Sequence, residues 1–215
     1  MAMMMSKKKS RMWVSRHLKD PFVKKSKSES LRSRSSYKLS EIIDKTGLLR
    51  RGMAVVDLGA APGGWSQVAS RVVGPEGFVL ATDTSMFDSI DGVEIILGDF
   101  NEETVFDSLL VAAGKNIDVV LSDLSPNLTG VREIDQPQCF HLADQALDFS
   151  RRVLKPGGAF IVKVFQGSGF DEFVLDLRRV FNAVTIKKPK ASRSRSREVY
   201  AVATGFDDHG RRVNE

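Results

Sequence analysis

The residues between 57 and 67, DLGAAPGGWSQ, have the types and spacing of a ligand-binding turn. An apolar run around Asp57 precedes the three glycines, and apolar side chains at helical spacing follow them up to Val73, which predicts a strand, a tight turn and a helix. Glycines suit such a turn because the backbone can adopt positive φ angles and a ligand can approach without meeting a Cβ.

The same stretch excludes two common phosphate-binding motifs. No Gly-Lys-Ser/Thr follows the glycines, as a phosphate loop requires, and the spacing of Gly59 and Gly63 is not that of a dinucleotide fingerprint. Pro62 and Trp65 would also be poor neighbours for a pyrophosphate. The turn therefore favours a ligand with an adenosine but no phosphates, such as S-adenosylmethionine. A structural turn that binds nothing is the alternative.

Acidic residues follow several other apolar runs. They are Asp57, Asp83, Asp99 and Asp123, each at or near the end of a predicted strand. Carboxyl ends of parallel strands meet at one edge of a sheet, so we expect these carboxylates at one rim, with Asp83 placed for ribose hydroxyls. Lys163 is different, because it lies inside an apolar run, where an ammonium group is costly unless it is paired or deprotonated. A snorkelling lysine at a strand end is the alternative.

Alternating strands and helices must position these residues. Strands are predicted at 54–58, 77–82, 93–97, 117–122, 159–165, 183–186 and 199–204, and helices at 30–44, 65–73, 101–113, 138–153 and 170–181. Gly47 is expected to close the first helix, and residues 155–158, KPGG, to separate the fourth predicted helix from the fifth strand. This alternation predicts an α/β, Rossmann-like fold with a seven-stranded, mostly parallel sheet, one antiparallel strand and helices on both faces.

The charge is concentrated near the start of the chain. Residues 1–51 contain 15 Lys and Arg against 4 Asp and Glu, although the whole chain has a net charge of only +5. A second basic run lies at 187–197 and contains no acid. Solvated loops can look like this, but two basic segments on a cofactor-binding fold favour a nucleic-acid partner. We predict a basic, loosely ordered arm over 1–28, interrupted by Pro21, a cofactor-binding domain over 29–206 and a disordered tail over 207–215.

Composition limits the other possibilities. Cys139 is the single cysteine and the three histidines are scattered, so we expect neither a disulfide framework nor a structural metal. No apolar run reaches the length of a membrane span, and the lysine-rich start has no apolar stretch behind it, as a secretory signal requires. These features predict a cytoplasmic protein, and a monomer is our default expectation.

The motifs together closely resemble the FtsJ/RrmJ family of ribose 2′-O-methyltransferases. The matching segments are RSRSSYKL at 32–39, DLGAAPGGWSQ at 57–67, GDF at 98–100, SDLSPN at 122–127, VKVFQG at 162–167 and SRSREVYAVATG at 194–205. The resemblance extends from about Trp13 to Gly205. It implies S-adenosylmethionine as cofactor. The chain length and basic start are similar to the bacterial branch that methylates a uridine in the A loop of 23S ribosomal RNA.

The resemblance also implies roles for individual residues. The family's catalytic tetrad falls on Lys38, Asp123, Lys163 and Glu198. Cofactor contacts are implied at Gly63, Trp65, Asp83, Asp99 and Asp123, with Gly59 and Gly64 of the same turn added to them. A lysine can accept a proton only when neutral, and burial or a nearby cation lowers its pKa. We therefore predict Lys163, beside Lys38, as the general base, with Lys38 stabilising the developing oxyanion and the two carboxylates orienting both.

The basic segments supply the expected RNA contacts. These are Lys7, Lys8, Lys9, Lys24, Lys25, Arg32, Arg34, Arg193, Arg195 and Arg197, which would bind phosphates without reading sequence. We expect the partner to be ribosomal RNA within the assembled 50S subunit. Two other functions remain open: a ribose methyltransferase acting on the transfer RNA anticodon loop, which would share every catalytic residue, and a non-enzymatic RNA-binding assembly factor.

Overall fold

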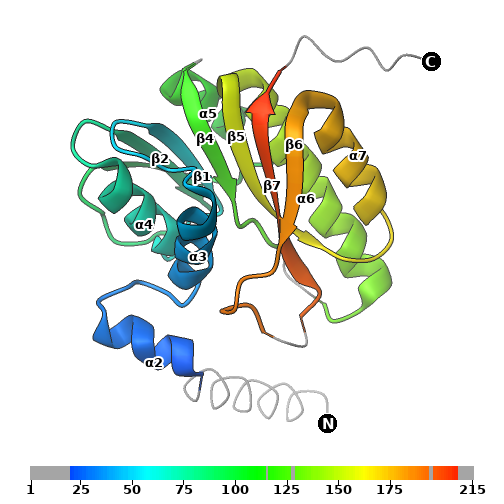
Figure 1. The fold of residues 1–215 in the computed structure, drawn as a ribbon, viewed down its shortest axis with the longest axis horizontal. Helices are drawn as coiled ribbons and strands as arrows, with labels where there is room; N and C mark the ends of the chain where they lie inside the picture. The colour runs from blue at the N-terminus through cyan, green and yellow to red at the C-terminus, as the bar shows by residue number, and fades with distance from the viewer. Residues whose placement is uncertain (1–19, 115, 127–128, 194–195, 208–215) are drawn as a thin grey trace.

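The computed structural model describes residues 20–114, 116–126, 129–193 and 196–207. One sheet of seven strands has the order β3-β2-β1-β4-β5-β7-β6 (Figure 1). The strands are β1 (Ala54–Leu58), β2 (Phe78–Asp83), β3 (Val93–Leu97), β4 (Ile117–Ser122), β5 (Leu154–Phe165), β6 (Phe181–Lys187) and β7 (Glu198–Phe206). The helices are α2 (Pro21–Ser28), α3 (Ser36–Thr46), α4 (Gly64–Val73), α5 (Glu103–Ala113), α6 (Arg132–Val153) and α7 (Phe170–Val180).

The direction of one strand sets the geometry of the rim. Strands β1 to β5 pair in parallel, whereas β7 lies between β5 and β6 and is antiparallel to both. The carboxyl ends of the parallel strands lie at the lower edge of the sheet in Figure 1, and β7 begins at that same edge. The predicted α/β fold with one antiparallel strand is therefore confirmed.

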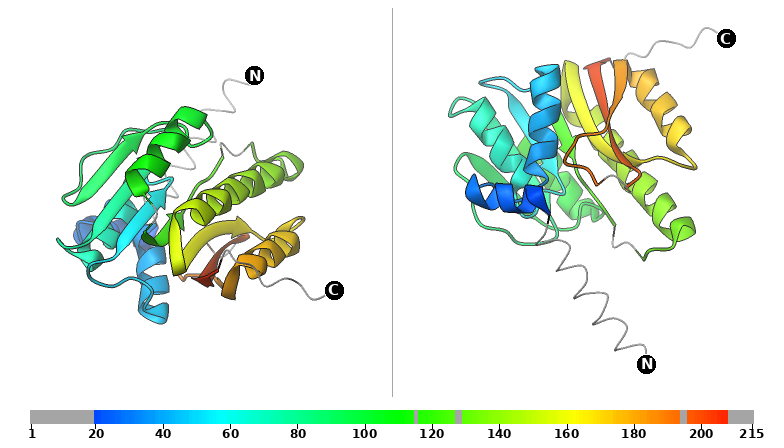
Figure 2. Two further views of the ribbon diagram at one scale, coloured as in Figure 1. Left: turned by 90° about the horizontal axis from the view of Figure 1, so that it is seen from above. Right: turned by 60° about the horizontal axis from the view of Figure 1, so that its bottom comes forward.

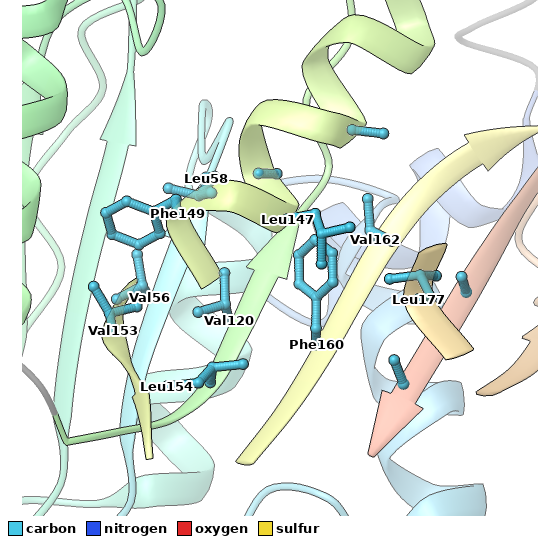
Figure 3. Close-up of a cluster of buried hydrophobic side chains, with 14 of the residues drawn as sticks. Val56, Leu58, Val120, Leu147, Phe149, Val153, Leu154, Phe160, Val162 and Leu177 are labelled. Atoms are coloured by element: carbon cyan, nitrogen blue, oxygen red, sulfur yellow. The ribbon is translucent and has the colours of Figure 1, made fainter. Parts of the chain in front are cut away.

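Helices cover both faces of the sheet, and each face has its own apolar core (Figure 2). Helices α3 and α4 pack on one face through residues such as Leu39 and Val68. Helices α5, α6 and α7 pack on the other, where Val56, Phe149 and Phe160 are fully buried (Figure 3). Removing these side chains from water, at about 25 cal/mol per Å² of apolar surface, fixes the sheet between its two helical layers.

The structure contradicts the expectation for Pro21. We expected Pro21 to interrupt the N-terminal segment, but it occupies the first turn of α2, where its missing N–H is not needed, and Asp20 caps that helix by accepting from the Phe22 N–H at 2.9 Å. Residues 1–19 of the predicted arm, and the predicted tail from 208 onward, lie outside the described residues.

Helix α6 begins at Arg132, earlier than the predicted 138, and includes Pro137. The Asp135 carboxylate accepts the N–H groups of Thr129 and Gly130 at 2.7 and 2.9 Å, which supports this added turn ahead of the proline.

Two other boundaries differ in instructive ways. Strand β5 starts at Leu154 rather than 159, because Leu154 pairs with Ile117 of β4 and the Pro-Gly-Gly segment forms an irregularity inside the strand. Helix α3 starts at Ser36 rather than 30, after Ser30 adopts a φ of 53°. Its end is as predicted, since Gly47 caps it in the left-handed conformation with a φ of 64°.

Candidate active site

The four predicted catalytic side chains converge at the rim of the sheet. Lys38 Nζ donates to Glu198 Oε1 at 2.5 Å, and Lys163 Nζ donates to the backbone oxygen of Asp123 at 2.6 Å and lies 3.2 Å from its Oδ1. Both lysines are 9% exposed. Each buried ammonium group therefore has a carboxylate partner, as burial of a charge requires.

Tyr200 joins these two ion pairs and was missed by the sequence analysis. Its hydroxyl accepts from Lys38 Nζ at 3.1 Å and donates to Asp123 Oδ1 at 2.9 Å. Glu198, Lys38, Tyr200, Asp123 and Lys163 thus form one continuous chain of hydrogen bonds, which we call the catalytic cluster. The Tyr200 hydroxyl therefore links Lys38 to the carboxylate that pairs with Lys163.

Strand register explains why these residues meet. In the β5–β7 pair, Lys163 lies opposite Tyr200, and Phe165 lies opposite Glu198. Because side chains on a strand alternate between faces, Glu198 and Tyr200 point to the same face, on which α3 presents Lys38. This two-residue spacing was the signal that could have identified Tyr200 from sequence.

The environment of Tyr200 keeps its hydroxyl protonated. Burial, followed by the charges of Asp123 and Glu198, raises the pKa of Tyr200 well above its ordinary value. Its ring packs against Trp65 with centroids 5.4 Å apart. The Trp65 side chain is itself buried, and its Nε1 donates to the Ser35 carbonyl at 2.9 Å. The Trp65 side chain therefore supports the cluster from behind, and its contact with a cofactor stays a prediction.

Beside the catalytic cluster, a cleft of about 920 Å³ opens at the carboxyl ends of β1, β2 and β4. Gly59, Asp83, Asp99 and Asp123 line it, as expected for ligand contacts. Three carboxylates and no lysine or arginine stand among the described residues of this lining. Such a cleft suits a ligand with hydroxyl groups and positive charge better than one with phosphates.

The carboxylates of the cleft are held in place by backbone groups. Asp83 accepts the Ala61 N–H on Oδ2 at 2.9 Å, which ties the end of β2 to the glycine turn. Its Oδ1 accepts the Ser85 N–H at 2.8 Å. Asp99 uses Oδ1 for the N–H groups of Asn101, at 2.9 and 2.7 Å. Both acids therefore reach the cleft already oriented.

The three glycines of the turn meet different structural requirements. Gly59 has a φ of +77°, and a Cβ there would lie 2.9 Å from the Leu124 backbone, so it lets the ends of β1 and β4 approach each other. Gly63 has a φ of +94° and precedes the first turn of α4, whereas a Cβ on Gly64 would lie 2.2 Å from Ser33 Oγ. Gly63, Gly64 and Trp65 are not among the lining residues of the cleft.

Asp57, behind the turn, is a fully buried acid. Ser66 Oγ donates to its Oδ2 at 2.6 Å, whereas its Oδ1 has no partner among the described residues. Burial raises the pKa of Asp57 to about 7, and the negative charges of Asp123 and Asp83 act in the same direction. The carboxyl group is therefore partly protonated near neutrality, and its protonation makes the free energy of unfolding depend on pH.

The model of one protein family matches residues 31–206, most of the chain, and its description is FtsJ-like methyltransferase. The chain belongs to the FtsJ-like methyltransferase family. It is 52% identical to a protein of Cellvibrio japonicus named "Ribosomal RNA large subunit methyltransferase E", over 93% of this chain and 95% of the relative.

Solved structures agree with this assignment. The FtsJ-like chain superposes on a crystal structure of a candidate ribosomal RNA methyltransferase from Plasmodium falciparum with a TM-score of 0.73 and 29% identity, covering 81% of this chain and 98% of the other. Human Methyltransferase-like protein 13, solved in complex with SAH, shares the fold with a TM-score of 0.58 at 18% identity, covering 81% of this chain and 84% of the other.

Two of the basic residues expected to contact RNA have internal roles in this FtsJ-like methyltransferase. Arg32 donates to the carbonyls of Asp88 and Ser89 at 2.6 and 2.5 Å. Arg34 forms an ion pair with Asp20 and donates to the Ala191 carbonyl. These donors hold chain segments together, and the RNA contacts expected of both arginines stay a prediction.

The other basic positions are free to meet a polyanion. Lys24, Lys25, Arg193 and Arg197 are exposed, and Lys25 also lies 3.6 Å from Glu29. The predicted contacts at Lys7, Lys8, Lys9 and Arg195 lie outside the described residues.

Neither a metal cluster nor a membrane helix marks the described part of the methyltransferase. Within that part, no group of three His, Cys, Asp or Glu residues is arranged to hold a metal ion. The same residues include no helix that is both long and apolar enough to cross a bilayer.

Proposed function

We propose that the protein transfers a methyl group from S-adenosylmethionine to the 2′-hydroxyl of a ribose in ribosomal RNA. The observation that supports this most strongly is the position of the catalytic cluster at the edge of the cleft, with Asp123 belonging to both. A lysine held by a carboxylate beside a cofactor-sized cleft provides a proton acceptor where a hydroxyl must lose its proton.

The cleft has the chemistry that this cofactor needs. Asp83, at the end of β2, is placed to accept hydrogen bonds from ribose hydroxyls, and Asp99, after β3, from an exocyclic amine. The carboxylate of Asp123, and the lack of lysine and arginine among the described lining residues, favour the cationic sulfonium and ammonium groups of the cofactor. When bound, S-adenosylmethionine supplies an activated methyl group, so the protein has only to align and deprotonate the acceptor.

The residues of the cluster divide this work. Methyl transfer would break the bond from the methyl carbon to the cofactor sulfur and form the bond to the ribose oxygen. The proton of the broken O–H bond would pass to Lys163, which must first lose its own proton to act as a base. Asp123 holds Lys163 through its backbone oxygen and its carboxylate. Lys38, oriented by Glu198 and Tyr200, stabilises negative charge on the oxygen. General-base help of this kind is worth about 10²–10⁴-fold in rate.

The substrate is proposed from the relatives' names and from surface charge. The curated relatives are named for the large ribosomal subunit, and we propose the uridine of the A loop in 23S ribosomal RNA as the target, within the 50S particle. Exposed lysines and arginines on α2 and the β6–β7 loop support a phosphate-rich partner. We further propose that the enzyme acts as a cytoplasmic monomer.

Methyl transfer to candidate RNAs tests this function directly. Tritiated S-adenosylmethionine would be incubated with the protein and, in parallel, with 50S particles lacking the modification, free ribosomal RNA and transfer RNA. We expect incorporation into the 50S particles, and mapping of the labelled nucleotide to a 2′-O-methyluridine in the A loop. Labelling of transfer RNA alone would support the anticodon-loop activity instead. RNA binding without any transfer would favour the non-enzymatic assembly factor.

A further inference from the structure

A second pocket, of about 300 Å³, lies near the catalytic cluster. Phe165 and Cys139 give it apolar walls, and Arg132, Gln166 and Arg197 stand around it. We call it the Phe165 pocket. It shares no lining residue with the cofactor cleft, and it has about a third of that cleft's volume.

The Phe165 pocket adjoins the cluster through both β5 and β7. Phe165 lies two residues after Lys163 and opposite Glu198 in the strand pair. Arg197 directly precedes Glu198, and its carbonyl accepts the Gln166 N–H at 3.1 Å. Burial raises the pKa of the Cys139 thiol, while the charge of Lys163 acts to lower it.

The catalytic cluster therefore stands between two cavities. Asp123 lines the cofactor cleft, whereas the residues flanking Lys163 and Glu198 line the Phe165 pocket. In an in-line transfer the acceptor oxygen must lie between the methyl donor and the rest of its own nucleotide. If the donor occupies the cleft, the acceptor nucleotide approaches from the side of the Phe165 pocket.

The size and side chains of the pocket match a single nucleobase. Small-ligand sites range from about 300 to 1,000 Å³, so this pocket stands at the lower limit and excludes anything much larger than one base with its sugar. Single-stranded RNA is commonly recognised by unstacked bases that pack on aromatic rings or guanidinium planes. Among the described residues, the Arg197 guanidinium and the Gln166 amide have no side-chain partner.

We propose that the Phe165 pocket holds the base of the nucleotide whose ribose is methylated. Phe165 packs against the face of that base, Gln166 offers hydrogen bonds to its edge, and Arg197 contacts a flanking phosphate. This inference rests on the proposed function, because it assigns the acceptor side of the same active site.

Protection of Cys139 from alkylation tests the pocket without requiring methyl transfer. Cys139 is the only cysteine, so N-ethylmaleimide labelling reports on this wall alone. The labelling rate would be measured at about pH 8.5, near the ordinary thiol pKa. The probes are a single-stranded oligouridylate and an abasic oligomer of equal length, both with S-adenosylhomocysteine present.

We expect the oligouridylate to slow labelling about tenfold at about ten times its Kd, and the abasic oligomer to give little protection. Equal protection by both oligomers, or protection by neither, would overturn the base assignment.

Matched substitutions provide the second test. Phe165→Leu should raise the KM for RNA about 5- to 100-fold, because stacking on an aromatic ring is lost. Phe78→Leu, at the amino end of β2, is the control for this change. S-adenosylhomocysteine affinity and the unfolding temperature of each variant would show that the fold and the cofactor cleft are intact.

The two proposals can fail separately. If the wild-type protein methylates no RNA, the proposed function is refuted, and the Cys139 protection experiment still decides whether a base enters the pocket. If the wild type methylates RNA and Phe165→Leu leaves its KM unchanged, the pocket proposal is refuted and the methyltransferase function stands.

Discussion

The cofactor cleft and the catalytic cluster are built in different ways, although Asp123 belongs to both. The cleft is made from turns that directly follow β1, β2 and β3, and backbone N–H groups orient its acids. The cluster is made from side chains that α3, β5 and β7 bring together from distant parts of the chain, and those side chains orient one another.

This difference suggests that the two regions respond differently to substitution. A change in the cleft removes one contact to a ligand, because Asp83 and Asp99 are held by N–H groups and not by each other. A change in the cluster alters every neighbour, because the hydrogen bonds form one chain. Energies in such a network are not additive, so single substitutions report on the network rather than on one residue.

The largest expected effect separates the two regions. We expect Lys163→Ala to lower the rate of methyl transfer about 10²–10⁴-fold, because the proton acceptor is lost, while S-adenosylmethionine affinity changes only a few-fold. Asp83→Asn should do the reverse, weakening cofactor binding more than it lowers the rate at saturation. Single-turnover tritium transfer and calorimetric titration measure the two effects. Lys155→Ala is the matched control, because Lys155 Nζ pairs with Asp118 Oδ1 at a distance of 2.5 Å and this pair lies away from the rim. Near-normal turnover by Lys163→Ala would refute the role of Lys163 as the general base.

A smaller effect tests the link within the cluster. Tyr200→Phe keeps the ring against Trp65 but removes the hydroxyl between Lys38 and Asp123. We expect kcat to fall about tenfold, since a hydrogen bond to a charged group is lost, with little change in the KM for RNA. Tyr37→Phe is the control, because that hydroxyl donates to Glu29 at 2.7 Å on the surface. An equal decrease of kcat in both variants would mean that the Tyr200 hydroxyl does not act through the cluster.

Asp57 gives the cleft side a pH dependence of stability. Its pKa is raised to about 7, so folding favours the protonated form, and the stability that Asp57 contributes is greatest at low pH and falls as the pH rises from about 4 to about 7. Asp57→Asn removes this titration. We expect the unfolding temperature of the variant, measured relative to that of the wild type at the same pH, to rise by a few degrees between pH 5 and pH 8. Parallel pH profiles for the two proteins would contradict this assignment.

The smallest expected effect concerns RNA binding at the rim. Replacing Lys24 and Lys25 with alanine should make the slope of log K for RNA binding against log salt concentration shallower by about one to two. The unfolding temperature should stay unchanged. Arg34→Ala should instead lower the unfolding temperature by about 2–4 °C, because Arg34 holds Asp20 and the Ala191 carbonyl. Filter binding at several salt concentrations and thermal unfolding distinguish the two. An unchanged slope in the lysine variant would exclude α2 from the RNA interface.

The sequence predicted the parts of the site that depend on local pattern. The glycine turn, the acids at the strand ends and the mostly parallel sheet with one antiparallel strand follow from short-range rules and from motif resemblance. Tyr200 was missed because its role depends on facing Lys163 across a strand pair. Arg32 and Arg34 were assigned to RNA because composition cannot show that a carbonyl or a carboxylate of the same protein already occupies a guanidinium group.

The reversed direction of β7 has a practical consequence for experiments on the protein. Since β7 starts with Glu198 at the rim and ends with Phe206 at the opposite edge of the sheet, the chain leaves the domain on the side away from the cluster (Figure 1). A fluorophore or surface tether joined after β7 would leave the edge with the cluster unobstructed, whereas one joined directly ahead of α2 would start near that edge.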